Sequence, residues 1–173
     1  MSVMKLLGAL LLIGTGSTIG FCKAYELKQR IRGIIMLQNA FRLLETEIFY
    51  SRTPVPQAIA LLEPKLSGTS RQFFCQVRNA VESEHQPLYV AWDSALQCMA
   101  QNSFWRSEEL EAVRNFGYSL GAGDAMEQQK NFQLLQQRLQ QALCHAEQMC
   151  AEKARIWQYM GICASAAAVL MLY

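Results

Sequence analysis

The chain has 173 residues, with 16 lysines and arginines against 14 aspartates and glutamates, and a net charge of +2. This length fits one domain of ordinary size, and so small a charge excludes a bulk electrostatic affinity for nucleic acid. The charges are unevenly distributed, because residues 1–22 hold only Lys5, residues 156–173 hold none, and the other 29 lie between. We therefore predict a soluble central domain, residues 23–155, between two apolar ends.

Both ends are predicted to span a membrane. Seventeen uncharged residues precede Lys23 and eighteen uncharged residues, 156–173, end the chain. As helices these segments reach roughly 26 Å, near the thickness of a bilayer core of about 30 Å. We predict transmembrane helices at residues 3–22 and 156–173. A cleaved signal peptide or a lipid anchor on Cys22 is the alternative for the first segment, although it lacks a clear A-x-A-like site.

Basic residues on the inner flanks of the two segments predict their orientation. Only Lys5 lies on the outer side. The inner flanks carry Lys23, Lys28, Arg30, Arg32, Lys153 and Arg155. By the positive-inside rule, residues 23–155 are predicted to lie in the cytoplasm.

The first two helices of the central domain are predicted from heptad spacing and a proline. The apolar residues Leu27, Ile34, Phe41 and Ile48 recur every seven positions, without glycine or proline between 34 and 53. This pattern indicates a long amphipathic helix continuous with the first apolar segment. Thr53 is predicted to cap a second helix, Val55–Leu66, with Pro54 in its first position.

Four more helices are predicted in the rest of the domain, with no strand pattern. The third begins at Ser70, the fourth follows Pro87, and the fifth begins at Ser107 as its N-cap and ends near 117–123. The sixth, from 124 to 160, is continuous with the last segment. Its narrow apolar seam consists of Phe132, Leu135, Leu139, Ala142, Ala146 and Met149. The fold class is thus all-α, a bundle of about six helices.

Patterns typical of catalysis or of cofactor binding are lacking in the sequence. His85 and His145 have no partner at metal-ligand spacing, and the six cysteines include no C-x-x-C pair. We therefore expect reduced thiols, no metal, no cofactor, no small-molecule substrate and no enzymatic activity.

Two segments of the chain carry a family resemblance. Residues 44–58 match the pattern L-E-x-E-I-x-Y-x-x-T-P-L-P-x-A, with Val55 replacing the usual leucine. The matching residues are Leu44, Glu45, Glu47, Ile48, Tyr50, Thr53, Pro54, Pro56 and Ala58. Residues 116–128 match F-G-x-x-L-G-x-x-D-x-x-x-Q through Phe116, Gly117, Leu120, Gly121, Asp124 and Gln128. With the paired apolar ends, these segments resemble the stage III sporulation protein AB family over essentially the whole chain.

The resemblance implies a component of the channel between mother cell and forespore in endospore-forming bacteria. It implies a domain similar to the cytoplasmic domains of the platform proteins of type II secretion and type IV pilus machines. By that analogy the chain is a non-enzymatic membrane adaptor whose partner is the ATPase stage III sporulation protein AA. The expected location is the mother-cell side, in the outer forespore membrane, with the main domain in the mother-cell cytoplasm.

The motif residues are candidates for interaction, although much of their pattern is explained by architecture. Glu45 and Glu47 lie on different helix faces, so one is expected to pair with Arg42 or Arg52 while the other points to a partner. The alternative is that both are solvated or bonded within the turn. The other interaction candidates are Tyr50, Thr53, Pro54, Pro56, Phe116, Gly117, Leu120, Gly121, Asp124 and Gln128.

Three of these candidates have specific structural expectations. Gly117 and Gly121 are predicted to permit close helix packing from one face, and Asp124 to cap the last helix. Two other functions remain open: an oligomeric scaffold or channel-wall component, whose spans associate through small residues at Gly16 and Gly20, and an exported helical binding module.

Overall fold

The computed structural model describes the backbone of residues 2–101, 104–121 and 123–172, and the side chains of residues 25–101, 104–121 and 123–152. The described backbone forms six α-helices and one short 3-10 helix, and it contains no strand. The predicted all-α class and the predicted number of helices are confirmed.

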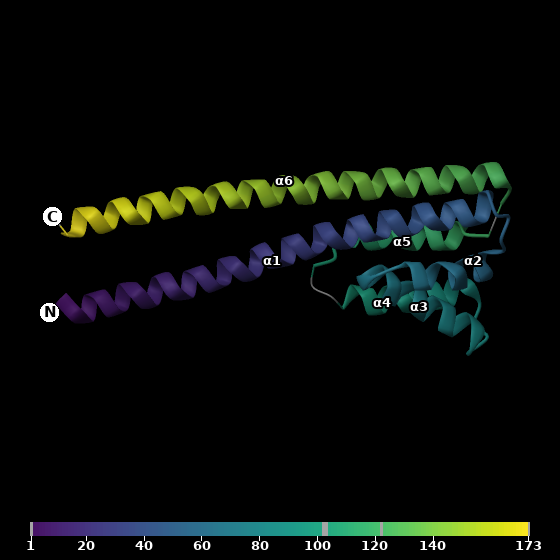
Figure 1. Cartoon of the computed structure of the whole chain (residues 1–173), viewed down its shortest axis with the longest axis horizontal. Coiled ribbons are helices and arrows are strands. Elements are labelled where there is room, and N and C mark those ends of the chain that lie inside the picture. The colour runs from purple at the N-terminus through teal and green to yellow at the C-terminus, as the bar shows by residue number, and fades with distance from the viewer. Residues whose placement is uncertain (1, 102–103, 122, 173) are drawn as a thin grey trace.

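Two long helices frame the molecule. The first, α1 (Ser2–Phe49), and the last, α6 (Ala125–Leu172), have 48 residues each and lie antiparallel, side by side, with both chain ends at the same end of the molecule (Figure 1). Between them, Gln38 Nε2 donates to Gln140 Oε1 at 3.1 Å, and Gln136 Nε2 donates to the Gln38 carbonyl oxygen at 3.1 Å.

The shorter helices form a second layer at the end remote from the chain termini (Figure 1). They are α2 (Val55–Leu62), η1 (Glu63–Lys65), α3 (Gly68–Glu82), α4 (Leu88–Ala100) and α5 (Ser107–Ser119). α4 packs between α3 and α5, α5 packs against α6, and α2 and α3 pack against α1. The remote half of each long helix thereby becomes part of a compact core.

The second helix is shorter than predicted. Its α-helical part ends at Leu62, and the chain continues as the 3-10 turn η1 rather than to Leu66. Pro64 explains the change, because its ring has no N–H to donate and clashes with the carbonyl four residues earlier in an α-helix.

Two predicted helix caps are wrong. Pro54, with φ −56° and ψ 143°, occupies the cap position of α2 instead of Thr53, so the first helical residue is Val55. Arg106 occupies the cap position of α5, and Ser107 is the first helical residue. Glu109 takes the capping role by accepting the Arg106 backbone N–H on Oε2 at 2.7 Å. In a capping box, the side chain of the third helical residue accepts the backbone N–H of the cap residue, and Glu109 does so here.

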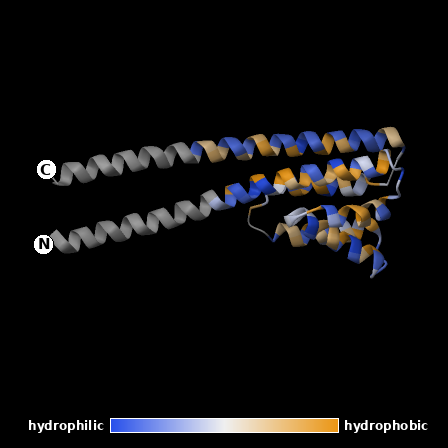
Figure 2. Cartoon of the chain, in the orientation of Figure 1, coloured by the Kyte–Doolittle hydropathy of each residue, from blue (hydrophilic) through white to orange (hydrophobic). Residues whose placement is uncertain are grey.

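The core is an aromatic cluster around Trp92 of α4. Its ring centroid lies 4.9 Å from that of Phe73, 6.0 Å from Phe116 and 6.1 Å from Phe41, and its Nε1–H donates to the Val113 carbonyl oxygen at 3.0 Å. α1, α3, α4 and α5 therefore meet at one indole ring. Hydrophobic residues are dense in this part of α1 and in the short helices, whereas polar residues dominate the described part of α6 (Figure 2).

The predicted apolar seams are the buried faces of the long helices. Ile34 and Phe41 have no exposed surface, while Leu27 and Ile48 are half-buried at the two ends of the α1 heptads. Five of the six predicted seam residues of α6 are buried, and Met149 is half-buried. Phe132 of this seam contacts Phe116 of α5, with ring centroids 4.6 Å apart.

One ion pair is buried between α1 and α5. Arg30 Nε donates to Glu109 Oε1 at 2.8 Å, and its Nη2 donates to the same oxygen. The side chains are 4% and 0% exposed. Because Glu109 Oε2 also accepts the Arg106 N–H, both carboxylate oxygens of Glu109 are satisfied.

The predicted membrane spans, 3–22 and 156–173, lie outside the residues whose side chains are described. Among the residues that are described, no helix is both long enough and apolar enough to cross a bilayer.

The tight contact at Gly117 predicts an unusual response to alanine. A Cβ built at Gly117 would collide with the pyrrole edge of the Trp92 indole. Glycine to alanine inside a helix ordinarily stabilises a protein by roughly 0.5–1 kcal/mol. For Gly117→Ala we expect a loss of about 1–3 kcal/mol from overpacking. Urea titration of the purified full-length chain measures this difference, with Ser94→Ala on the exposed face of α4 as a near-neutral control.

The buried ion pair predicts a large loss when one partner is removed. Glu109→Ala leaves the Arg30 guanidinium buried without its carboxylate, so we expect a loss of about 3–5 kcal/mol in the free energy of unfolding. Asp93→Ala, which breaks the partly exposed pair of Arg114 Nε with Asp93 Oδ1 at 2.9 Å, should cost about 0–1 kcal/mol. Similar losses for both variants in urea titrations would contradict a dominant role for burial.

Candidate functional site

The two family motifs converge at the end of the molecule opposite the chain termini. Residues 44–58 cover the end of α1 and the start of α2, and residues 116–128 cover the end of α5 and the start of α6. These four helix ends lie together at the right of Figure 1, and the packing of α1 against α6 and of α5 against α6 joins them. We call this end, formed by residues 42–56 and 120–129, the distal end.

The motif residues divide into a buried group and an accessible group. The buried members are Leu44, Ala58, Phe116, Gly117 and Leu120. The half-buried members are Glu45, Glu47, Ile48, Thr53 and Gln128. The exposed members are Tyr50, Pro54, Pro56, Gly121 and Asp124. Only the last two groups are accessible to a partner.

The two glycines of the second motif have different roles. Gly117 lies under Trp92, as the prediction of close packing required. Gly121 lies beyond the end of α5 with φ +83°, and a Cβ built there would meet no atom within 4 Å, so the packing prediction is wrong for this residue. Its role is conformational, because the left-handed region is open to glycine without strain. Gly121 allows the chain to turn from α5 toward α6.

Asp124 caps α6 as predicted. Its Oδ1 accepts the Glu127 backbone N–H at 2.7 Å, and its carbonyl oxygen accepts the Gln128 backbone N–H at 3.0 Å. The carboxylate also lies at the positive end of the helix dipole. This part of the second motif is therefore accounted for by the start of α6.

Glu47 pairs with a residue that the sequence did not suggest. Lys65 Nζ lies 2.9 Å from Glu47 Oε1, whereas Arg42 and Arg52 were the expected partners. The hydrogen bond from Lys65 is the main cause of a lowered pKa at Glu47, and the positive charge of Lys65 adds to it. The pair joins the end of α1 to η1. The sequence did not predict this pair, because the two residues are far apart along the chain and their contact depends on how the chain reverses after α1.

Glu45 lies in a concavity between α1 and α6. The concavity has a volume of about 550 Å³ and is lined by Arg42, Glu45, Thr46, Phe49, Tyr50 and Gln129. Burial raises the pKa of Glu45, and the positive charge of Arg42 partly opposes that rise. Within the described part of the chain, no hydrogen bond or ion pair engages the Glu45 carboxylate. Glu45 is thus a partly desolvated charge in an open site.

Tyr50, in the turn after α1, lines the concavity and is 87% exposed. The ring of Phe49 packs edge-on against Phe132 with a centroid distance of 5.8 Å, which closes the floor of this end. Four residues that line the concavity were not among the predicted interaction candidates: Arg42, Thr46, Phe49 and Gln129.

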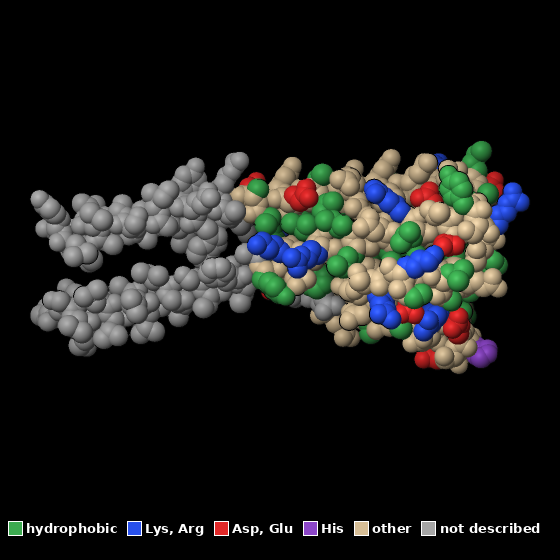
Figure 3. Space-filling model, viewed as in Figure 1, with side chains coloured by type: hydrophobic (Ala, Val, Ile, Leu, Met, Phe, Trp, Pro, Cys, Tyr) green, Lys and Arg blue, Asp and Glu red, His purple; other side chains and the backbone are tan. Residues whose placement is uncertain are grey.

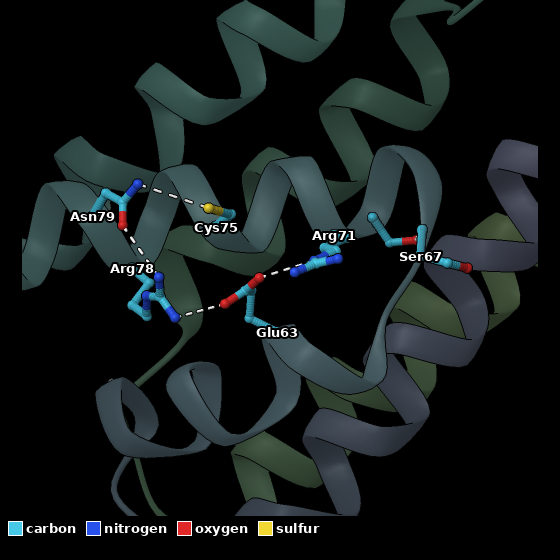
Figure 4. Close-up of polar contacts among 7 residues, drawn as sticks. Glu63, Ser67, Arg71, Cys75, Arg78 and Asn79 are labelled. Atoms are coloured by element: carbon cyan, nitrogen blue, oxygen red, sulfur yellow. Dashed lines mark hydrogen bonds and ion pairs between the residues drawn. The ribbon is translucent and has the colours of Figure 1, made fainter.

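Other polar clusters of the short helices serve the fold. The Glu63 carboxylate of η1 lies between two guanidinium groups of α3, with Arg71 Nε at 3.0 Å and Arg78 Nη1 at 2.6 Å (Figure 4). These contacts fix η1 against α3 and use both carboxylate oxygens of Glu63. Across the face seen in Figure 3, hydrophobic side chains lie in small groups between charged ones. No set of three His, Cys, Asp or Glu side chains in the described residues is arranged to hold a metal.

The two motif glutamates predict opposite effects of pH on stability. Glu45 has a folded pKa above 4.5, so its ionisation destabilises the fold above that pKa and not below 4.5. Glu47 has a folded pKa below 4.5, so its contribution is present above 4.5 and is lost as pH falls through the folded value. Near neutral pH, Glu45→Gln should raise the melting temperature slightly and Glu47→Gln should lower it. Both differences should shrink at about pH 3.5, and shifts of equal sign near neutrality would contradict the assignment.

Comparison with known proteins identifies the family. The family model described as stage III sporulation protein AB matches residues 5–173. A relative named stage III sporulation protein AB from Bacillus subtilis (strain 168) is 27% identical over 170 residues, which cover 98% of this chain and 99% of the relative. A solved structure of a stage III sporulation protein AB superposes with a TM-score of 0.65 at 27% identity, covering 71% of this chain and 97% of that one. The chain therefore belongs to the stage III sporulation protein AB family.

Proposed function

We propose that the chain is a non-enzymatic membrane adaptor of the channel between mother cell and forespore, and that it couples a cytoplasmic ATPase to the membrane complex. Membership of the stage III sporulation protein AB family supports a role in sporulation. The observation that carries the adaptor role is the position of the accessible motif residues. They gather at the distal end, as far as possible from both chain termini (Figure 1).

This arrangement suits a protein held at one end and bound at the other. In the proposal, residues 3–22 and 156–173 span the outer forespore membrane, and residues 23–155 lie in the mother-cell cytoplasm. α1 and α6, at about 1.5 Å per residue, are each roughly 72 Å long. A partner bound at the distal end would therefore act on both proposed spans through continuous helices.

The chemistry of the distal end favours binding over catalysis. Two of its carboxylates are engaged in structural contacts, since Asp124 caps α6 and Glu47 pairs with Lys65. Glu45 has no neighbouring nucleophile or base in hydrogen-bonding reach among the described side chains. The proposed partner is stage III sporulation protein AA, and the adaptor needs no cofactor and no small-molecule substrate.

The position of the central domain is the first test of the adaptor. In spheroplasts of a non-sporulating cell that produces the chain in its cell membrane, protease added outside should leave residues 23–155 intact until lysis, and carbonate-washed membranes should retain the chain. Digestion before lysis would contradict the adaptor and would favour an exported helical module or a channel-wall component. Intact-mass analysis shows whether the N-terminal segment is retained, which an exported and cleaved module would lack.

Binding of the ATPase is the second arm of the same test. The full-length chain in lipid nanodiscs should bind purified stage III sporulation protein AA, and empty nanodiscs should not. If the domain is protected in spheroplasts but the ATPase does not bind, the oligomeric scaffold becomes the better function. Crosslinking in membranes that yields only monomers would then exclude the scaffold as well.

A further inference from the structure

The distal concavity holds a half-buried carboxylate, Glu45, that no basic side chain of the described residues pairs with, although an opposite charge lies one helical turn away. Arg42 and Glu45 are three residues apart on α1, a spacing at which oppositely charged side chains usually meet. Among the described residues, no ion pair or hydrogen bond joins their side chains. Elsewhere, the half-buried or buried carboxylates of Glu47, Glu63 and Glu109 each form an ion pair with a lysine or arginine side chain.

Leaving Glu45 unpaired has a free-energy cost that the isolated chain does not recover. A partly desolvated carboxylate loses hydration, and the raised pKa of Glu45 is the consequence. A cation in the concavity would restore favourable contacts for this carboxylate. Arg42 is exposed and presents a planar guanidinium, which can bind a carboxylate through two parallel hydrogen bonds.

The surroundings of the two charges match the centre of a protein interface. Tyr50 stands at the rim with 87% of its surface exposed, and tyrosine and arginine are enriched among the residues that contribute most to binding between proteins. A partner that packs on Tyr50 would exclude water from the concavity and strengthen the charge contacts within it. The volume of about 550 Å³ has room for more than one partner side chain.

We propose that the distal concavity receives a helix of a partner protein that presents a basic and an acidic side chain one turn apart. The basic side chain pairs with Glu45, the acidic side chain pairs with Arg42, and Tyr50 covers both pairs. The inference rests on the proposed function, in which the distal end binds the ATPase, and it names the chemistry that the ATPase must present. A reciprocal charge pair gives orientation as well as affinity, because the reversed helix would bring like charges together.

Charge reversal in the full-length chain tests the proposal. The chain in lipid nanodiscs is titrated with purified stage III sporulation protein AA, as wild type and as Arg42→Glu, Glu45→Arg and the double variant. Each single reversal should weaken binding at least about tenfold. The double variant keeps the net charge but exchanges the two positions, so it should bind as weakly as the single variants. Glu147→Arg, at an exposed position on α6 away from the distal end, is the matched control and should bind as wild type does.

Tyr50→Ala is a variant that should fold as the wild type does, because the Tyr50 side chain is almost fully exposed. It should also weaken binding at least about tenfold while its melting temperature stays that of wild type. Suppose that the wild-type chain binds the ATPase and that Tyr50→Ala and the single reversals bind it with the same affinity. This result would overturn the inference and leave the adaptor function standing. Wild-type affinity for the double variant alone would also overturn it, because net charge rather than paired geometry would then decide binding.

Two further outcomes would overturn the proposal in distinguishable ways. If the wild-type chain does not bind the ATPase, the adaptor function fails, and the inference fails with it. The same charge pair is self-complementary about a twofold axis, so a second copy of the chain is the competing occupant. Mass measurements in which the reversals abolish dimers of this chain without changing ATPase affinity would assign the concavity to that copy.

Discussion

The contact between Trp92 and Gly117 is the constraint on which the rest of the fold depends. The indole approaches the backbone of α5 so closely that no side chain fits there, and it is surrounded by Phe41, Phe73 and Phe116. This packing fixes α5 against α4 and α1, and the contact of Phe116 with α6 carries the constraint to the last helix. The position of α5 then determines where the chain turns at Gly121. It therefore determines which part of α6 meets the end of α1 to form the concavity.

The opposite end of α5 is fixed by charge. Arg30 and Glu109 are almost completely buried, and a shift of α1 against α5 in either direction would leave both charges buried without partners. Such a pair adds little net stability compared with a well-packed apolar pair, and we infer that it contributes here by selecting one register. Apolar packing at one end of α5 and a buried ion pair at the other together specify its position. The geometry of the distal end therefore depends on both the apolar packing and the buried ion pair.

Periodicity predicted the helices and the apolar seams because it reports which face of each helix is buried. Two predicted caps, Thr53 and Ser107, were each one residue too early or too late. Pro54 has an extended backbone and is itself the cap residue of α2, and Glu109 accepts the backbone N–H of Arg106, the cap residue of α5. The pairing of Glu47 with Lys65 and the concavity around Glu45 depend on segments brought together by the fold. No short-range pattern in the sequence records such contacts. The two family motifs lie together at one end of the molecule, and several of their residues form its turns and helix ends.

The motifs combine residues that shape the distal end with residues that are accessible to a partner. Gly117, Gly121 and Asp124 place the start of α6 beside the end of α1, and Glu47 fixes the chain where it reverses after α1. These residues bring Gln129 opposite Glu45, and neither Glu45 nor Tyr50 is needed by the packing that surrounds them. A fold alone would gain stability by replacing a half-buried unpaired carboxylate with a neutral side chain. Its presence at the one place where both motifs meet is what a binding surface requires, since the charge becomes favourable only when a partner supplies its counterpart.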